Sequence, residues 1–494
     1  MAAKRPNILW YCTDQQRWDT IRGLGNPHIR TPRLDALRAG GTAFRRAYAQ
    51  SPICTPSRAT MLTGRYPATH HVHRNGAVAF PASEVLVTRI LADAGYDCGL
   101  IGKFHLSQAR GHERRVDDDG YRVWQWSHHP LPNLDPEHHA YHRWLADEKG
   151  VDPVALYAGI EGFCGAGVPA ELHQTTWCTE MAIRFIRERR EGPWLLSVNP
   201  FDPHPPFDPP PEYLERYDPA GLPPPLFRPG DIERQKAFRG VAQQTVDALD
   251  PFGEMVADGR KGDERLKTAY APPASFNGQA VKAAYYAMIE LIDDQFGRLL
   301  DAIAAAGQLD DTLIVFMSDH GEMLGDHGLL YKGCRFFEGL VHVPLILSWR
   351  GHVLEGTTSE ALVELVDVAP TLLDAANVPV PSFMQGRSLW PLLTGRSDPH
   401  RHRDHVVSEY NDALGSAAVP VPSHGSMYFD GRWKHIVYHG TGLGELFDLE
   451  EDPGEFVNLW DEPGARELRF ELLGRHFDAM MATSGAGIER ASIY

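Results

Sequence analysis

Four segments of the chain combine apolar, β-prone residues with polar residues directly after them. They are residues 7–13, 96–101, 194–198 and 312–317. Continuous apolar runs of this length are typical of strands that are buried on both faces of a sheet. The sequence therefore predicts four interior strands, each ending where the chain turns polar.

Apolar residues at helical intervals lie between and after these strands. The spacing predicts helices over 84–94, where Gly95 is suited to end the helix, over 279–306 and over 363–376. Strands that alternate with helices are typical of an α/β fold with a parallel sheet. We therefore expect a large, mostly parallel mixed sheet between two layers of helices.

The polar residues that follow the four strands carry carboxylate, ammonium, amide and imidazole groups. In an open α/β sheet, ligands bind beyond the carboxyl ends of the strands. One such strand end would mean little, but four together predict a single shared site at one edge of the sheet. The residues concerned are Asp14, Gln15, Lys103, His105, His204, Asp319 and His320.

Other segments interrupt or follow this pattern. Residues 107–191 are rich in His, Trp and acidic residues and are interpreted as excursions from the sheet that form a lid, whereas residues 202–275 are rich in Pro and predict long loops. We expect a catalytic α/β domain over 1–385 and a smaller C-terminal α+β domain with an antiparallel sheet over 386–494. The elements expected in the smaller domain are strands at 405–409, 426–429 and 433–438 and a helix at 465–481.

Composition and charge narrow the class of protein. The chain has 494 residues, too many for one small domain, and its 48 Lys and Arg against 65 Asp and Glu give a net charge of −17. This balance argues against a nucleic-acid partner and against adsorption to anionic lipid. No apolar run reaches the roughly 18 residues that a membrane-spanning helix needs, so no membrane association is expected.

The cysteines and the N-terminal residues bear on the cellular compartment. Six cysteines in a chain of this length are too few for a disulfide framework, and their scatter matches no zinc-ligand spacing. The apolar run 8–11 is too short for the hydrophobic region of a signal peptide and leads directly into Thr13 and Asp14. We therefore expect a cytoplasmic protein.

One cysteine differs from the others because of its neighbours. Cys54 opens the sequence Cys-Thr-Pro-Ser-Arg, which ends at Arg58 and is followed by a Leu-Thr-Gly that ends at Gly64. Cys54 or Thr55 can cap a helix that has a proline in its first turn and that Gly64 ends. The sulfur would then lie at a helix N-terminus beside Arg58, where negative charge is stabilised.

These residues resemble the signature of the type I sulfatase family, within the alkaline phosphatase superfamily. The resemblance covers most of the chain and includes Pro-Asn-Ile-Leu at 6–9, Gly-Lys-Phe-His at 102–105, Asp-His-Gly-Glu at 319–322 and Glu-Leu-Phe-Asp-Leu at 445–449. It implies an alkaline-phosphatase-like fold and hydrolysis of a sulfate monoester to an alcohol and inorganic sulfate. It also implies that a formylglycine-generating enzyme oxidises Cys54 to formylglycine after translation.

The chemistry of this family gives a reason for each residue type. An aldehyde at position 54 hydrates to a geminal diol, and one hydroxyl, ionised with the help of a divalent metal, attacks sulfur in line. The alcohol leaves, and loss of the second hydroxyl proton then expels sulfate and restores the aldehyde. The cycle needs a base near the diol, an acid near the leaving oxygen and cations around the sulfuryl oxygens.

The resemblance implies one divalent metal ion, bound by Asp14, Gln15, Asp319, His320 and the modified Cys54. Two carboxylates supply charge, while the amide and the imidazole are neutral. The pairing of Gln15 with His320 resembles the choline sulfatases and the phosphonate monoester hydrolases. An imidazole among oxygen ligands suits Mn²⁺ better than Ca²⁺, and both ions remain open.

Five further residues match family positions around the sulfate. The resemblance implies that Lys103 holds the diol and the sulfuryl oxygens and that His105 assists deprotonation of the second hydroxyl. Arg58 would orient the diol. His204 would bind sulfate and protonate the leaving oxygen, and Lys332 would be a second sulfate-binding lysine.

Other candidates have ordinary structural explanations as well. Asn75 fits a family position near the substrate, but Asn-Gly is also a common turn. Trp124, Trp126, His128 and His129 either line a substrate pocket or pack a loop, and the second outcome is the more common one for such a cluster.

The identity of the substrate and the assembly state remain open. The alcohol can be aryl, sugar or alkyl. A phosphonate monoester hydrolase or phosphodiesterase shares the nucleophile and the metal pattern, and a pseudoenzyme that only binds sulfated ligands is the non-enzymatic alternative. Lys103 with His105 favours the sulfatase, because phosphonate monoester hydrolases carry neutral side chains at that strand end. The apolar tail after Gly485 favours a homo-oligomer.

Overall fold

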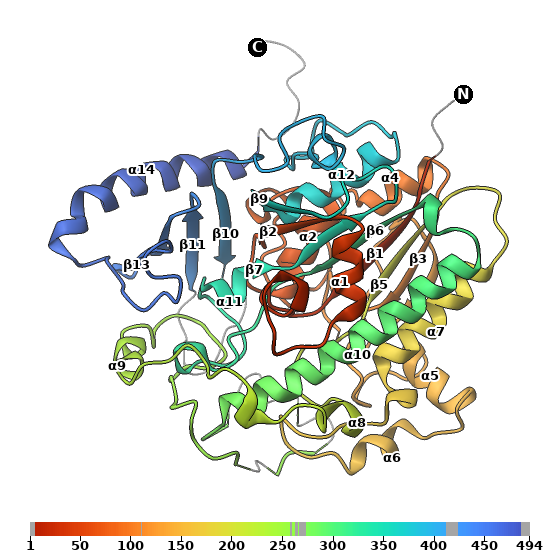
Figure 1. Ribbon diagram of the computed structural model, residues 1–494, viewed down its shortest axis with the longest axis horizontal. Coiled ribbons are helices and arrows are strands. Elements are labelled where there is room, and N and C mark those ends of the chain that lie inside the picture. Colours follow the sequence, from red (N-terminus) through yellow and green to blue (C-terminus); the bar gives the residue numbers. More distant parts are fainter. Residues whose placement is uncertain are drawn as a thin grey trace.

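The computed structural model describes most of the chain, and its architecture rests on two sheets. The described residues are 5–109, 111–256, 259–261, 265, 273–411 and 423–485. Within them, one sheet has nine strands and the other has four. Figure 1 shows the larger sheet surrounded by helices, with the smaller sheet to one side of it.

The larger sheet is mixed and mostly parallel. Its strands are β1 (Asn7–Thr13), β2 (Thr42–Tyr48), β3 (Asp97–Gly102), β4 (Tyr121–Trp126), β5 (Trp194–Asn199), β6 (Thr312–Ser318), β7 (His342–Val343), β8 (Leu345–Ser348) and β9 (Thr357–Glu364). The order is β4-β3-β5-β1-β6-β8-β2-β7, and β9 pairs with β2. The five adjacent strands β4, β3, β5, β1 and β6 all run parallel, whereas β8 is antiparallel to β6 and to β2.

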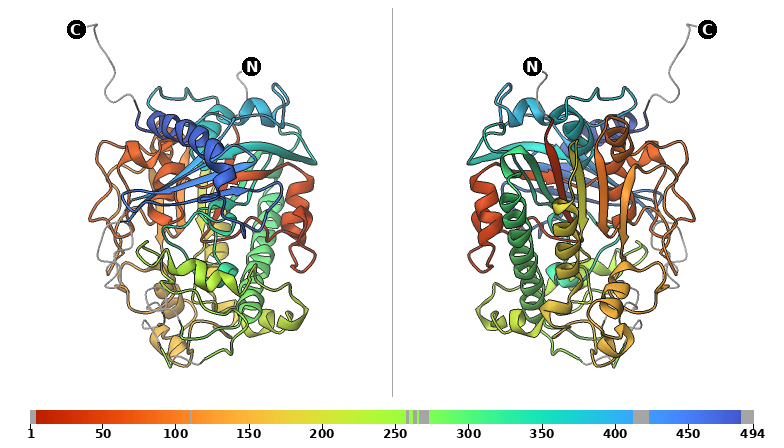
Figure 2. Two further views of the ribbon diagram at one scale, coloured as in Figure 1. Left: turned by 90° about the vertical axis from the view of Figure 1, so that its left-hand side faces the viewer. Right: turned by 90° about the vertical axis from the view of Figure 1, so that its right-hand side faces the viewer.

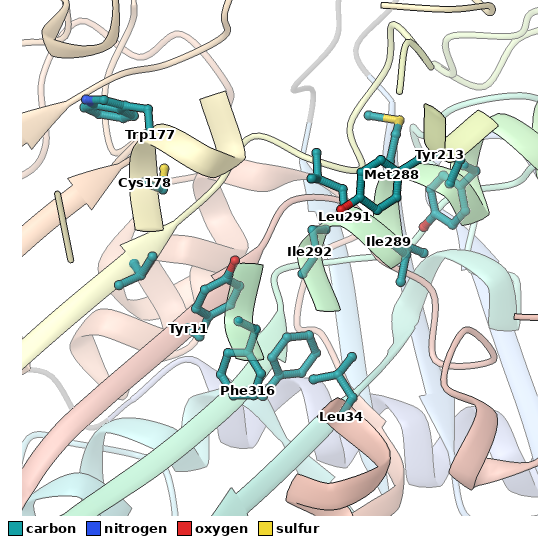
Figure 3. Packing of buried hydrophobic residues seen from close by; sticks show 14 of the residues in the cluster. Tyr11, Leu34, Trp177, Cys178, Tyr213, Met288, Ile289, Leu291, Ile292 and Phe316 are labelled. Atoms are coloured by element: carbon teal, nitrogen blue, oxygen red, sulfur yellow. The ribbon is translucent and has the colours of Figure 1, made fainter. Parts of the chain in front are cut away.

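Helices cover both faces of this sheet. Leu9 and Tyr11 of β1 pack in one hydrophobic cluster, and Ile8 and Trp10 pack in a second, so alternate residues face opposite layers. Figure 3 shows part of the first cluster, with Tyr11 close to Phe316 of the neighbouring strand. The first layer contains α1 (Pro32–Ala39), α7 (Gln174–Arg187) and α10 (Gly278–Ala305), and the second contains α2 (Cys54–Thr63), α4 (Val87–Asp93) and α12 (Val368–Ala375).

The remaining helices outside the C-terminal region are short and lie in the connections. They are α3 (Pro67–His70), α5 (Ala140–Asp147), α6 (Pro153–Ala158), α8 (Pro211–Leu214), α9 (Gly230–Lys236), α11 (Glu338–Val341) and α13 (Trp390–Leu393). Figure 2 shows, together with Figure 1, that α5, α6 and α8 lie at the end of the molecule far from the N-terminus. Within its described part, the segment 202–275 contains only short helices, so the prediction of long loops is confirmed there.

A second, antiparallel sheet follows near the C-terminus. Its strands are β10 (Val406–Asn411), β11 (His424–Phe429), β12 (Trp433–Tyr438) and β13 (Leu443–Asp448), and α14 (Arg466–Thr483) packs against them. The expected antiparallel sheet and closing helix are confirmed, and β13 is one strand more than the pattern predicted. Leu389 and Leu393 pack in the core of the larger sheet, and the domain boundary at 385/386 stays a prediction.

The four interior strands and the helix at 279–306 are confirmed, but two expectations need correction. The helix expected over 363–376 begins only at Val368, because β9 runs to Glu364 and a 3₁₀ turn follows over Leu365–Asp367. Apolar residues on a buried strand and on a buried helix look alike over such a short span, which is why the pattern merged them.

The segment 107–191 is not simply a lid over the site. It contributes β4, which extends the larger sheet at one edge, and α7, which covers β3 and β5. The helix predicted over 84–94 starts at Val87, and Gly95 adopts a positive φ of 93° after it. None of the helices in the described ranges combines the length and apolar composition that crossing a bilayer requires.

Candidate active site

The structure brings the residues of the expected site together at the carboxyl edge of four neighbouring strands. β3, β5, β1 and β6 are consecutive in the sheet. Thr13 and Ser318 end β1 and β6 and are register partners, so these strand ends lie level. Asp14 and Asp319 follow them directly, and Lys103 follows β3 on the other side of β5. The topology therefore brings together residues that are far apart in the sequence.

Helix α2 places Cys54 at this edge of the sheet. Cys54 is the first residue of α2, after an extended Ile53, and no side chain of Cys54 or Thr55 caps the helix, so that part of the expectation is wrong. Instead, Asn75 Oδ1 accepts a hydrogen bond from the Thr55 backbone N–H at 2.9 Å. Gly64 ends the helix in the left-handed conformation, as predicted. The sulfur thus lies at the positive end of a helix dipole.

Both anionic and cationic groups surround the cysteine. Its Sγ lies 3.6 Å from Asp14 Oδ1 and 3.1 Å from His320 Nε2. Two ammonium groups also reach it, with Lys332 Nζ at 2.9 Å and Lys103 Nζ at 3.7 Å. All five side chains are almost fully buried. This is the arrangement expected for a site where a negative charge develops and is shared by several donors.

The metal-ligand positions predicted from the sequence converge on one point. Ligand atoms of Asp14, Cys54, Asp319 and His320 all lie within 4.8 Å of one another. His320 Nδ1 lies 2.9 Å from the Gly321 carbonyl oxygen, which fixes that nitrogen as the N–H donor and leaves Nε2 as an acceptor facing the sulfur. Two carboxylates and an imidazole lone pair form a donor set that suits one divalent cation.

Gln15 lies at the same place but is engaged by neighbours. Its backbone has a positive φ of 70°, and its N–H donates to Asp319 Oδ1 at 3.0 Å. Its side-chain N–H₂ donates to Glu322, while its Oε1 accepts from Lys332 Nζ at 2.7 Å. The amide oxygen therefore points toward the cationic side of the site, and Glu322 fixes its orientation.

The local charges favour anions in this site. Burial alone would raise the pKa of Asp14, but Lys103, then His204 and Arg58, hold that pKa well below its ordinary value. Burial and Asp14 also oppose ionisation of Cys54, yet the two ammonium groups nearby lower the pKa of its thiol. Two lysines and an arginine therefore outweigh the desolvation cost of negative charge here.

Arg58 ties the helix to two strand ends. Its Nε donates to Asp319 Oδ2 at 2.8 Å and its Nη1 donates to the Lys103 carbonyl oxygen at 3.1 Å. Its Nη2 has no hydrogen-bond partner among the described residues. One NH₂ group of a fully buried guanidinium therefore remains for a ligand.

The loop after β3 holds His105, the predicted base. His105 has a positive φ of 58°, and its backbone N–H donates to Glu113 Oε2 at 2.7 Å. Glu113 also accepts from the N–H groups of Leu106 and Ser107 and from the Trp126 indole. The sequence pattern missed Glu113, because one acidic residue in a polar loop gives no signal until the fold places three backbone N–H groups and an indole N–H around it.

His204 lies in the Pro-rich loop after β5. Its Nδ1 lies 2.7 Å from the Pro205 carbonyl oxygen, so Nδ1 carries the proton, and its ring packs against Phe201 at 4.4 Å. Burial and then Lys332 lower the pKa of His204 well below its ordinary value, while Asp14 opposes this shift. The side chain therefore shares the electrostatic environment of the site.

The weaker candidates divide into two groups. Trp126 is buried and donates its indole N–H to Glu113 at 2.9 Å, and Trp124 packs against Phe104 at 5.2 Å, so both shape the loop. The ring of His128, in contrast, meets His105 edge to face at 4.5 Å. The residues after Gly485 lie outside the described residues.

Known proteins resemble the chain over most of its length. Residues 6–378 match the family model described as Sulfatase, and residues 325–480 match the model described as N-sulphoglucosamine sulphohydrolase, C-terminal. The chain is 30% identical over 470 residues to an arylsulfatase of Clostridium perfringens, a match that covers 92% of this chain and 90% of that protein. It is 29% identical over 484 residues to a choline-sulfatase of Rhizobium meliloti, covering 94% and 84%.

A solved structure shares the fold as well. The phosphonate monoester hydrolase of Agrobacterium radiobacter matches with a TM-score of 0.77 and 26% sequence identity. The match covers 97% of this chain and 96% of that one. Both sheets of the present chain therefore have counterparts in one known architecture.

Proposed function

The chain belongs to the sulfatase family and is a sulfuric ester hydrolase, and from this premise we propose that it acts through a formylglycine formed from Cys54 and one divalent metal ion. The observation that carries the proposal is the position of the Cys54 sulfur. It lies at the N-terminus of α2, between two carboxylates and two ammonium groups. A buried cysteine with a purely structural role does not require charged groups around its sulfur.

The donor set fits a divalent ion. Asp14 and Asp319 would supply charge, His320 Nε2 a lone pair and Gln15 an amide oxygen. When bound, an ion of this kind supplies Lewis acidity that favours ionisation of an adjacent hydroxyl. The oxygen-rich set admits Ca²⁺ and the imidazole favours Mn²⁺, and elemental analysis of the active protein distinguishes them.

Formylglycine at position 54, in its hydrated form, would supply both the oxygen that attacks sulfur and the hydroxyl whose deprotonation releases sulfate. Lys103 and Lys332 would hold the sulfuryl oxygens, because both ammonium groups already reach the sulfur of Cys54. The unpaired Nη2 of Arg58 would donate to the same oxygens. These three cations would stabilise charge that develops during transfer.

Two histidines would move protons on opposite sides of the transferred group. His105 would accept the proton of the second hydroxyl, because its ring is neutral; burial and then Lys103 lower its pKa well below the ordinary value. His204 would donate a proton to the leaving alcohol oxygen, and the negative charge of a bound ester would favour its protonated form. The S–O bond to the alcohol breaks as the bond from the nucleophile to sulfur forms.

The direct test is the chemical state of residue 54 in active protein. Peptide mass spectrometry is expected to show the aldehyde in place of the thiol. Cys54→Ser is expected to reduce turnover of 4-nitrophenyl sulfate by about 10³-fold or more while the protein remains folded. Cys98→Ala, at a buried cysteine at the start of β3, is the matched control and is expected to keep turnover. A fully active sample that carries only the thiol would refute the proposal.

Phosphonate monoester or phosphodiester hydrolysis is the second candidate, since the chain resembles a phosphonate monoester hydrolase. We expect the sulfate ester to be preferred, because Lys103 and His105 supply the charge and the base that breakdown of a sulfated intermediate needs. The comparison uses 4-nitrophenyl sulfate and 4-nitrophenyl phenylphosphonate, which share one leaving group. A higher kcat/KM for the phosphonate would reverse the assignment.

Three further expectations complete the proposal. A formylglycine-generating enzyme would act on the chain during maturation, because the Cys-x-Pro-Ser-Arg sequence around Cys54 is intact. The protein would function in the cytoplasm and as a homo-oligomer. Co-expression with the maturation enzyme, cell fractionation and light scattering test these three points separately.

A further inference from the structure

His128 lies beside the proposed reaction centre with neither ring nitrogen engaged. It follows β4, and its ring meets that of His105 edge to face, with 4.5 Å between the ring centroids. Both Nδ1 and Nε2 are shut off from solvent, and neither has a hydrogen-bond partner among the described residues. Buried polar atoms without partners are rare in proteins, and each costs free energy unless a ligand or water satisfies it.

The unpaired atoms near His128 form a group. His105 Nδ1 and His129 Nδ1 are also buried without partners in the described part of the chain. The rings of His128 and His129 lie 5.4 Å apart. Three imidazoles that stand together with four unpaired nitrogens indicate a recess that receives hydrogen-bonding groups.

Ring contacts place His128 near the proposed acid for the leaving oxygen. Its ring centroid lies 6.2 Å from that of Phe201, which packs against His204 at 4.4 Å. Burial lowers the pKa of His128 well below the ordinary value, and His105, Lys103, His129 and His204 lower it further. Lys103 faces the sulfur of Cys54, and His204 is the proposed acid for the leaving oxygen. His128 therefore lies beside groups that would surround the ester and not in the apolar core.

The chemistry of a neutral imidazole selects among the possible alcohols. It offers one N–H donor and one acceptor nitrogen. An aryl ring would leave both nitrogens unpaired, and a second sulfate group accepts hydrogen bonds but cannot donate one. A hydroxyl group both donates and accepts, so it alone among these three satisfies either nitrogen of the ring.

We propose that His128 is part of a hydroxyl-binding subsite, so that the enzyme acts on the sulfate ester of a polyhydroxy alcohol, such as a sugar, with a free hydroxyl next to the ester. The proposal rests on the proposed function, because it needs the transferred group between His105 and His204, with the alcohol oxygen on the His204 side. It adds a substrate class to that function, and His128 acts in it as a specificity-determining residue.

A matched pair of substrates tests the subsite. Cyclohexyl sulfate and trans-2-hydroxycyclohexyl sulfate differ by one hydroxyl on the carbon next to the ester. In the wild-type enzyme, kcat/KM is expected to be higher for the hydroxylated ester by about 10-fold or more, the size of one hydrogen bond inside a protein. In His128→Leu, this ratio is expected to fall about 10-fold. Intrinsic differences between the two leaving groups cancel, because they are the same in both enzymes.

Two further variants separate recognition from structure. His128→Gln keeps a donor and an acceptor and is expected to retain part of the preference. His138→Leu, at an exposed histidine in the same segment, is expected to leave the ratio unchanged. If wild-type enzyme turns over neither ester, the two are compared as inhibitors of 4-nitrophenyl sulfate hydrolysis, and the same ratio is expected between their inhibition constants.

The outcomes distinguish this inference from the proposed function. Equal ratios in the wild type and His128→Leu would overturn the subsite, and so would equal losses for both esters, which would mean that His128 acts on structure or on the chemical step. Hydrolysis of 4-nitrophenyl sulfate that depends on Cys54 would still stand in both cases. Failure of the proposed function would instead abolish that activity's dependence on Cys54.

Discussion

Two arginine–carboxylate pairs are equally buried, but only one of them leaves a hydrogen-bonding group unused. Arg58–Asp319 in the active site and Arg335–Glu445 near the smaller sheet both have an N–O distance of 2.8 Å, and their side chains are at most 1% exposed. Arg335 also donates from Nε to the Tyr438 hydroxyl at 2.9 Å. Arg58 keeps Nη2 without a partner among the described residues.

The rest of the Arg335 guanidinium also has partners. Its Nη1 donates to Gln235, and its guanidinium lies 4.2 Å from the Phe238 ring centroid and 4.8 Å from that of Phe337. Every nitrogen of the group is therefore engaged by the protein itself. A charge with all its partners holds elements together, whereas a charge that lacks one is available to a ligand.

The first way to break this comparison is Arg58→Met, which has the largest expected effect. Loss of the cation is expected to reduce kcat/KM for 4-nitrophenyl sulfate on the order of 10⁴-fold, because Arg58 would neutralise the transferred group. In metal-loaded protein the free energy of unfolding is expected to fall less than it does for the matching change at Arg335. The reason is that a cation bound by Asp319 would replace the lost positive charge. Steady-state kinetics and urea unfolding of the loaded protein measure the two quantities.

The second way is the same substitution at the other pair. Arg335→Met leaves Glu445 buried without its counter-ion, and the expected cost is about 3–5 kcal/mol of unfolding free energy. The kcat of the folded fraction is expected to stay within a factor of about three, because Arg335 contacts no proposed catalytic group. A loss of kcat as large as that of Arg58→Met, with no loss of stability, would contradict the division between the two pairs.

The sequence predicted those parts of the site that local patterns carry. Strand ends at Asp14, Lys103 and Asp319 were identifiable because each polar residue follows an apolar run, and the parallel sheet brings such ends together. Cys54 was identifiable because its helix N-terminus and Arg58 lie within five residues. In each case the signal is short-range and the topology is one of few that the strand–helix alternation allows.

The rest depends on packing that no local pattern records. Glu113 holds the loop of His105 through three backbone N–H groups, and Asn75 binds helix α2 from a turn twenty residues away. β2 lies in the larger sheet with β7 and β8 along one edge and β9 along the other, although its sequence carries two arginines. Such residues gain their roles only after distant segments have packed, so single-sequence patterns do not distinguish them from surface residues.

A third buried carboxyl sharpens the comparison, because it has hydrogen bonds but no ion pair among the described residues. Asp293 of α10 accepts the backbone N–H groups of Arg33 at 3.0 Å and Leu34 at 2.8 Å. Burial raises its pKa to about 7. The folded state therefore holds a proton that the unfolded state releases near pH 4, and the stability this provides is lost as the pH rises through about 7.

Asp293→Asn removes this titration and keeps an acceptor oxygen. Relative to wild type, the variant is expected to gain unfolding free energy as the pH rises from 5 to 8, by up to about 2.7 kcal/mol, because about two pKa units lie between pH 5 and the folded-state pKa of about 7. Urea unfolding at several pH values measures the difference. A difference that stays constant over this range would mean that Asp293 is already ionised at pH 5.

The smallest expected effect concerns Asn75, for which the sequence left a turn and a substrate contact open. Its Oδ1 accepts the N–H of Thr55, one of the first N–H groups of α2, which have no partner within the helix. Asn75→Ala is therefore expected to cost about 1 kcal/mol of unfolding free energy. Thr55→Pro removes the same hydrogen bond from the donor side at a helix position that tolerates proline, so it is the matched control. Because both changes remove the same bond, the double variant is expected to be no less stable than Thr55→Pro alone, which a double-mutant cycle measures directly.

A second measurement separates helix positioning from a substrate contact. If Asn75 only positions the helix, the KM of Asn75→Ala for 4-nitrophenyl sulfate is expected to stay within about twofold of wild type, since less than about 0.5 kcal/mol of binding energy changes. A KM that rises about tenfold without any loss of stability would instead place the Asn75 amide against the substrate.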